Sequence, residues 1–148
     1  MNKINYWHMQ MHPDDKIYGE EHVYAILEHK KIVGLGHWEN GEKVRNKFSN
    51  EMNVNDIIAI KNGEKLIALV QVIGGSYRVE DDITDIGWIQ HRRPIRVLDW
   101  ALDGQLLPHP QGTLNKCKSD DVRTTQIIKK WHEEVMKSFT KRKLDIYV

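Results

Sequence analysis

Apolar and polar positions along the chain repeat with two periods, one typical of strands and one typical of helices. Apolar runs of strand length fill most of the first two thirds of the chain, and some alternate with polar positions. They predict strands over residues 4–11, 32–38, 54–61, 65–73, 76–80 and 95–100. Asn62-Gly63 separates two of these runs and is a strong signal for a two-residue hairpin turn.

Helical spacing predicts three helices. The segment 20–30 has an acidic start and a basic end, which suits the helix dipole, and a second short helix is expected over 42–50. Ser119 is the expected N-cap of the last helix. Its apolar stripe is the clearest amphipathic pattern in the sequence: Ile127, Trp131, Val135 and Phe139.

These elements together predict a single α+β domain over residues 1–148. The expected architecture is a curved sheet or small β-barrel flanked by helices. Trp100 and Trp131 are expected in its core, and the segment around Pro108, Pro110 and Gly112 is expected to be irregular.

Composition places the chain among ordinary globular proteins, with 40% apolar and 29% charged residues. No apolar run is long enough to cross a bilayer, and the single cysteine excludes an internal disulfide, so we expect a cytoplasmic protein without a membrane partner. Residues 1–90 carry 10 basic and 14 acidic side chains, whereas residues 91–148 carry 12 and 7. The basic half indicates either contact with a polyanion or a lysine-rich solvated surface.

Three short motifs of the chain resemble the EVE/PUA-like superfamily, within residues 32–115. They are Asn55-Asp56-Ile57-Ile58, Gly75-Ser76-Tyr77 and His91-Arg92-Arg93-Pro94-Ile95-Arg96-Val97. The sequence is most similar to the N-terminal specificity domains of McrB-like, modification-dependent restriction proteins. The resemblance implies a PUA-like (EVE-like) fold and a domain that binds DNA or RNA and flips one modified base, such as methylated cytosine or adenine, into an aromatic cage.

A flipped base needs flat walls for its faces and hydrogen-bonding groups for its edge. The walls can come from aromatic residues near predicted strand ends or turns: Trp38, Tyr77, Trp7 and Trp88. The alternative for each ring is an ordinary place in the core. The edge can be met by polar neighbours of these rings, which otherwise serve as turn residues: Asn40, Ser76 and Asp85.

Phosphates need cations, and the sequence offers them in its basic half. Arg92, Arg93 and Arg96 lie together, with Arg92 and Arg96 on one side of a strand and Arg93 on the other. Arg78, Lys116 and Lys118 extend this predicted backbone-binding strip. The alternative is a solvated basic face.

An enzymatic alternative rests on Pro13-Asp14 followed by Glu28 and Lys30, the loose spacing of a metal-dependent nuclease. That site requires Glu28 and Lys30 on a strand, whereas the pattern predicts a helix. The eight histidines form no metal-ligand motif, and a phosphate-binding glycine-lysine loop is absent from the sequence.

The residues predict a domain without cofactor or metal, and the resemblance implies a non-catalytic DNA-binding domain, the specificity module of a restriction system. Its expected partners are nucleic acid carrying a modified base and further domains or subunits of a restriction complex. An RNA-binding PUA-like domain is the second interpretation, and a protein-interaction module is the third.

Overall fold

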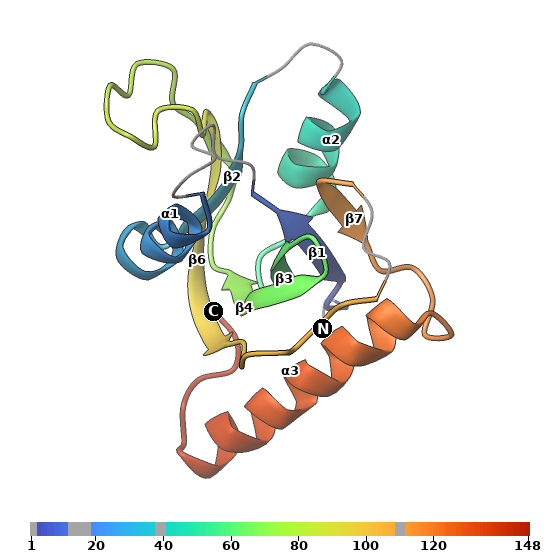
Figure 1. Ribbon diagram of the computed structural model, residues 1–148. Coiled ribbons are helices and arrows are strands. Elements are labelled where there is room, and N and C mark those ends of the chain that lie inside the picture. The colour runs from blue at the N-terminus through green and yellow to red at the C-terminus, as the bar shows by residue number, and fades with distance from the viewer. Residues whose placement is uncertain (1–2, 12–18, 38–40, 109–111) are drawn as a thin grey trace.

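The computed structural model describes residues 3–11, 19–37, 41–108 and 112–148, and these form a mixed sheet flanked by helices (Figure 1). The strands are β1 (Tyr6–Gln10), β2 (Ile32–Leu35), β3 (Ile57–Asn62), β4 (Lys65–Val72), β5 (Tyr77–Arg78), β6 (His91–Trp100) and β7 (Leu114–Lys116). The helices are α1 (Gly19–Ala25), α2 (Glu42–Asn46) and α3 (Arg123–Lys141). Two π-helical turns, η1 (Ile26–Lys30) and η2 (Lys47–Glu51), continue α1 and α2.

The strand order is β2-β6-β4-β3-β1-β7, and β5 pairs with the start of β6 on the side opposite β2, because both strands pair with His91 and Arg92. β1 and β3 run parallel, while the other pairs are antiparallel. The predicted hairpin is confirmed, because Gly63 turns β3 into β4 with a φ of 60°. The sheet curls so that β2 and β7, its two edges, lie on either side of α2 in the ribbon (Figure 1).

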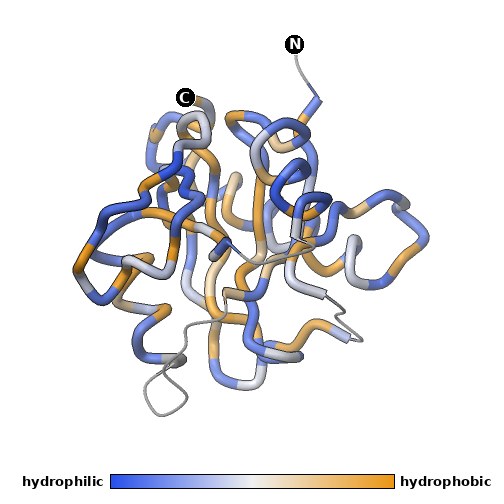
Figure 2. The backbone as a smooth tube through the Cα atoms, turned by 90° about the horizontal axis from the view of Figure 1, so that it is seen from above, coloured by the Kyte–Doolittle hydropathy of each residue, from blue (hydrophilic) through white to orange (hydrophobic). Residues whose placement is uncertain are grey.

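Both faces of the central strands are buried, which explains their nearly continuous apolar sequence. Ile58 and Ile60 of β3 face the core inside the curl, and Ile57 and Ala59 face the core beneath α3. The hydropathy map shows apolar stretches along the segments that run through the middle of the molecule (Figure 2). The predicted stripe of α3 is confirmed, because Trp131, Val135 and Phe139 are buried and Ile127 is half-buried.

Several details differ from the expectations. β6 begins at His91 rather than at residue 95, and β7 was not predicted. α3 begins at Arg123, and its N-cap is Val122. Ser119 is therefore not the N-cap that the sequence predicted, because a cap at Ser119 would require the helix to begin at residue 120. Trp100 is 37% exposed and stacks against Tyr24, since β6 extends past the core. None of the helices within the described ranges is long and apolar enough to span a membrane.

Candidate nucleic-acid interface

The backbone just before β6 packs directly on β2, and two glycines make this possible. A Cβ at Gly34 would lie 2.1 Å from Cγ2 of Ile89 and 2.5 Å from the carbonyl oxygen of His91. A Cβ at Gly36 would lie 3.2 Å from the carbonyl oxygen of Trp88. Glycine at position 34 is therefore required for the close approach, which brings the end of β2 beside the segment that carries Trp88.

This packing brings together a set of residues where β2 ends and where β5 and β6 begin. We call the group the β5–β6 rim: His37, Tyr77, Arg78, Trp88 and His91. The sheet register fixes its centre, because β5 pairs with β6 through Tyr77 opposite Arg92 and Arg78 opposite His91. Alternation along β5 then places Tyr77 and Arg78 on opposite faces of the strand.

Two histidines of the rim contact each other through their rings. Nδ1 of His37 lies 3.0 Å from Nε2 of His91, and the stacked ring centroids are 5.2 Å apart. Burial lowers the pKa of His91, and the charges of Arg78, His37 and Arg45 lower it further. One imidazole nitrogen must accept the proton that the other donates, so at least one ring is neutral while this contact holds. The pair presents a flat, polarisable surface beside a guanidinium.

Tyr77 and Trp88 give the rim its two larger rings. Tyr77 is 45% exposed, and Ser76 before it is half-buried. Trp88 packs partly against the core, and its buried indole Nε1 has no hydrogen-bond partner among the described residues. An unsatisfied buried donor costs about 1–3 kcal/mol, so an acceptor from a ligand or water would stabilise this position.

Trp7 does not line this rim, so the prediction that it forms a wall of the pocket is wrong. It is 0% exposed, and its indole Nε1 donates to Oδ2 of Asp56 over 2.9 Å. Asp56 also accepts hydrogen bonds from the backbone nitrogens of Asn5, over 3.0 Å, and Asn53, over 2.9 Å. The carboxylate thereby ties the start of β1 to the start of β3, which is a structural role.

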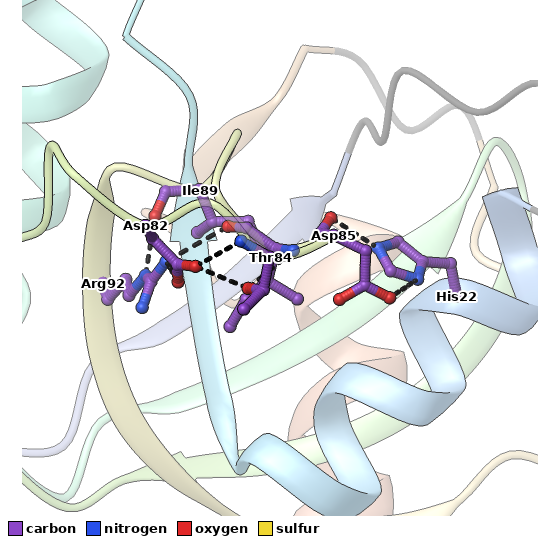
Figure 3. A network of polar contacts seen from close by, with 7 residues as sticks. His22, Asp82, Thr84, Asp85, Ile89 and Arg92 are labelled. Atoms are coloured by element: carbon purple, nitrogen blue, oxygen red, sulfur yellow. Dashed lines mark hydrogen bonds and ion pairs between the residues drawn. The ribbon is translucent and has the colours of Figure 1, made fainter.

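Of the residues predicted to bond to the edge of a base, the structure describes Asp85 and Ser76 but not Asn40. Asp85 contacts α1, because His22 Nδ1 lies 3.9 Å from its carboxylate and His22 Nε2 lies 3.3 Å from its backbone oxygen (Figure 3). That contact anchors the loop before β6. Ser76 stays beside Tyr77, so its role remains a prediction. Trp38 and Asn40 lie outside the described residues.

Arg92 is buried and holds the loop before β6, so its predicted contact with phosphate is wrong. Its guanidinium pairs with Asp82 over 2.6 Å and donates to the carbonyl oxygens of Ile89, over 2.7 Å, and Ile86, over 3.1 Å (Figure 3). Hydrogen bonds from the Thr84 hydroxyl and from Arg92 lower the pKa of Asp82 to about 2. With five donors in a fixed fork, Arg92 is well suited to bridge a carboxylate and carbonyls.

Arg93 is also a structural residue, and its predicted phosphate contact is likewise wrong. It is 3% exposed on the opposite face of β6. Its Nη1 donates to the carbonyl oxygens of Phe48, over 2.9 Å, and Met52, over 2.7 Å. Its Nε donates to the carbonyl oxygen of Gly74 over 3.2 Å. Arg93 therefore satisfies acceptors at the end of η2 that would otherwise be buried without donors.

Arg96 binds the C-terminal segment instead of facing solvent freely. Its Nε donates to Gln71 over 2.6 Å, and its Nη2 donates to the carbonyl oxygens of Asp145, over 2.6 Å, and Ile146, over 3.1 Å. The guanidinium also lies 5.5 Å from the ring centroid of Phe139. These contacts occupy the donors of Arg96 and give it a structural role that needs no phosphate.

The remaining predicted cations are more accessible. Arg78 is exposed and pairs with Glu80 over 2.9 Å. Lys118 is exposed, and the half-buried Lys116 holds its Nζ 5.9 Å from the ring centroid of Trp7. Both lysines border a cavity of about 290 Å³ between β1, β7 and the start of α3. For Arg78, Lys116 and Lys118, contact with a nucleic-acid backbone stays a prediction.

Sequence reasoning did not select the histidine pair of the rim or the cavity beside β7. His37 and His91 are far apart in the chain, and only the pairing of β2 with β6 brings them together. The cavity depends on β7, which the sequence did not predict. Glu28 and Lys30 lie in the helical turn η1, so the strand geometry of the nuclease alternative is absent there, and Asp14 lies outside the described residues.

Comparisons with known proteins agree with this architecture. Residues 7–129 match the model of a family described as a domain of unknown function, DUF8426. The chain is similar to the YTH domain of the Zygosaccharomyces rouxii MRB1 protein, solved in complex with N6-methyladenosine RNA, with a TM-score of 0.52 and 11% identity over 91% of this chain and 88% of that one. This likeness confirms the predicted α+β, PUA-like fold.

A weaker likeness is to human THYN1 in complex with 5-methylcytosine-containing DNA, with a TM-score of 0.42 and 10% identity over 90% of this chain and 78% of that one. No curated protein matches the chain.

Proposed function

We propose that this chain, which belongs to the DUF8426 family, reads a modified base in nucleic acid without cutting the strand. The observation that carries the proposal is the β5–β6 rim. It offers an exposed tyrosine on one face of β5 and a stacked imidazole pair on the other face, and nearby Trp88 has a buried indole N–H without a partner among the described residues. A base can stack on such rings, for about 1–3 kcal/mol per base, while a polar edge group meets the indole.

The fold adds support for a reader. The similar YTH domain was solved with N6-methyladenosine RNA, so the same arrangement of strands accommodates a modified base in that protein. In this chain the rim lies where β5 pairs with the start of β6, and it includes the exposed Arg78. A guanidinium at that place can hold a phosphate while a base enters the rim.

We propose DNA as the first substrate to test, because the sequence motifs resemble those of McrB-like specificity domains. In that setting the domain recognises the modification, and a separate motor or nuclease subunit of a restriction complex cuts. RNA is the second candidate, favoured by the likeness to the YTH domain. Both substrates offer the same phosphates and stackable faces, so the two require a direct comparison.

The test is a binding series with matched oligonucleotides that differ in one base modification. DNA duplexes with cytosine, 5-methylcytosine, adenine or N6-methyladenine, and RNA strands with adenosine or N6-methyladenosine, are titrated by fluorescence anisotropy at fixed salt. One modified oligonucleotide should bind at least about tenfold more tightly than its unmodified partner, which corresponds to about 1.4 kcal/mol.

Tyr77→Ala should remove most of this discrimination, and Tyr77→Phe should keep it. Tyr147→Ala is the matched control, because Tyr147 is a similarly exposed tyrosine, at 53%, near the C-terminus. Equal binding of every modified and unmodified pair would overturn the proposal. Shortened strands after incubation with Mg²⁺ would overturn its non-catalytic part.

A further inference from the structure

A second polar site lies in the cavity between β1, β7 and the start of α3. The cavity has a volume of about 290 Å³. Its lining includes a buried imidazole, two ammonium groups and three hydroxyls: His8, Lys116, Lys118, Ser119, Thr124 and Thr125. Such a mixture of cations and hydrogen-bond donors is typical of a site for an anion.

His8 is the most unusual member of this lining. It is 8% exposed, and its Nδ1 is buried with no hydrogen-bond partner among the described residues. Burial, and then the charge of Lys61, lower its pKa to about 4, so the ring is neutral at pH 7. A neutral imidazole retains one N–H that can be donated to a ligand oxygen. In the part of the chain that the structure describes, Trp88 Nε1 is the other buried side-chain nitrogen without a partner.

The start of α3 supplies backbone donors to the same place. The helix has 19 residues, and among the described residues no side-chain hydrogen bond caps its start. The cavity is lined by the N-cap residue and by two residues of the first turn of the helix: Val122, Thr124 and Thr125. The free N–H groups and the helix dipole favour a negative charge at this end.

The charges around the cavity favour an anion despite nearby carboxylates. Lys118 is exposed and Lys116 is half-buried, and both border the cavity. Asp120 is the nearest acidic residue along the chain, and it bonds to Lys129 of α3. That ion pair reduces its repulsion toward a phosphate. Asp121 is exposed, and its backbone N–H donates to the Ser119 hydroxyl over 3.2 Å.

We propose that this cavity binds one phosphate of the nucleic-acid backbone, and so holds the strand whose base enters the β5–β6 rim. This rests on the proposed function, since it assigns the backbone contact of the same complex. Lys116 and Lys118 neutralise the charge of the phosphate. The first N–H groups of α3 and the ring N–H of His8 donate hydrogen bonds to the phosphate oxygens. The contact is independent of the base, because every nucleotide carries the same phosphate.

The test uses a DNA duplex with one abasic position, which carries the phosphates but no base to read. Lys116→Ala and Lys118→Ala should each lower its affinity and reduce the slope of log K against log salt by about 0.9. Lys141→Ala, at the other end of α3, is the matched control and should leave the slope unchanged. In NMR spectra, the duplex should shift the His8 ring signals and the Thr124 amide signal.

The outcomes separate this site from the rim. If the lysine variants bind the abasic duplex as the parent does, and the His8 and Thr124 signals stay in place, the cavity is not a backbone site. If millimolar inorganic phosphate moves these signals while the duplex does not, the cavity takes a free anion and the proposal is wrong. If the lysine variants lose affinity but modified and unmodified oligonucleotides bind equally, the cavity proposal stands and the proposed reading function fails.

Discussion

The arginines of β6 and the lysines beside β7 carry the same charge but have opposite roles. Arg92 and Arg93 are buried and donate to a carboxylate and to backbone carbonyls. Lys116 and Lys118 border a cavity and remain at least partly accessible. The planar, multi-donor guanidinium suits internal scaffolding, whereas the flexible ammonium keeps its charge near water. The comparison teaches that a basic motif in the sequence does not locate a phosphate site until the strand pairing is known.

Arg93→Met should give the largest loss of stability, because Arg93 is one of the buried arginines of β6. The change removes a buried charge together with the donors to Phe48, Met52 and Gly74, so carbonyl acceptors are left unsatisfied. The free energy of unfolding should fall by about 1–3 kcal/mol for each buried carbonyl left unsatisfied, measured by urea denaturation. Lys118→Met is the counterpart from the other region and should change the same quantity by less than about 0.5 kcal/mol. Equal losses from both variants would remove the distinction.

His8→Gln tests the cavity region that Lys116 and Lys118 border, through the pH dependence of stability. The folded chain holds His8 neutral down to a pKa of about 4, while the unfolded chain takes up a proton near its ordinary value of 6.5. The parent should therefore lose stability as pH falls from 6.5 toward 4, because the unfolded state binds the additional proton. The variant should show a flatter dependence in that window, measured as unfolding free energy at several pH values. Parallel curves would show that His8 titrates normally in the fold.

Asp82→Asn gives the smaller effect, and in a lower pH window. Hydrogen bonds from Thr84 and Arg92 lower the pKa of Asp82 to about 2 from 3.8, so its contribution to stability is complete above pH 3.8 and is lost as pH falls toward 2. The stability difference between parent and variant should be largest near neutral pH and should shrink on acidification. A difference that stays constant from pH 7 to pH 2 would mean that the Arg92–Asp82 pair does not support the loop.

Much of the fold could be predicted from the sequence, because the apolar positions of the strands and of α3 repeat with the periods of the elements they form. The prediction failed on β7, a strand of three residues whose pairing with β1 is a long-range contact that no local pattern encodes.

The candidate site was harder to predict for the same reason. Tyr77 is exposed, whereas Trp7, which was predicted on the same grounds, is buried and bonded to Asp56. His37 and His91 meet only through strand pairing. Residue type indicates which chemistry is available, whereas burial and register decide which residues can use it.

The most direct test of the central claim follows the indole N–H of Trp88 by NMR, with its signal assigned through Trp88→Phe. Binding of the preferred modified oligonucleotide should shift this signal, because the buried donor gains an acceptor from the base or is enclosed by it. The unmodified partner oligonucleotide should leave it nearly in place. A saturated complex with the modified strand in which the Trp88 signal does not move would contradict the account.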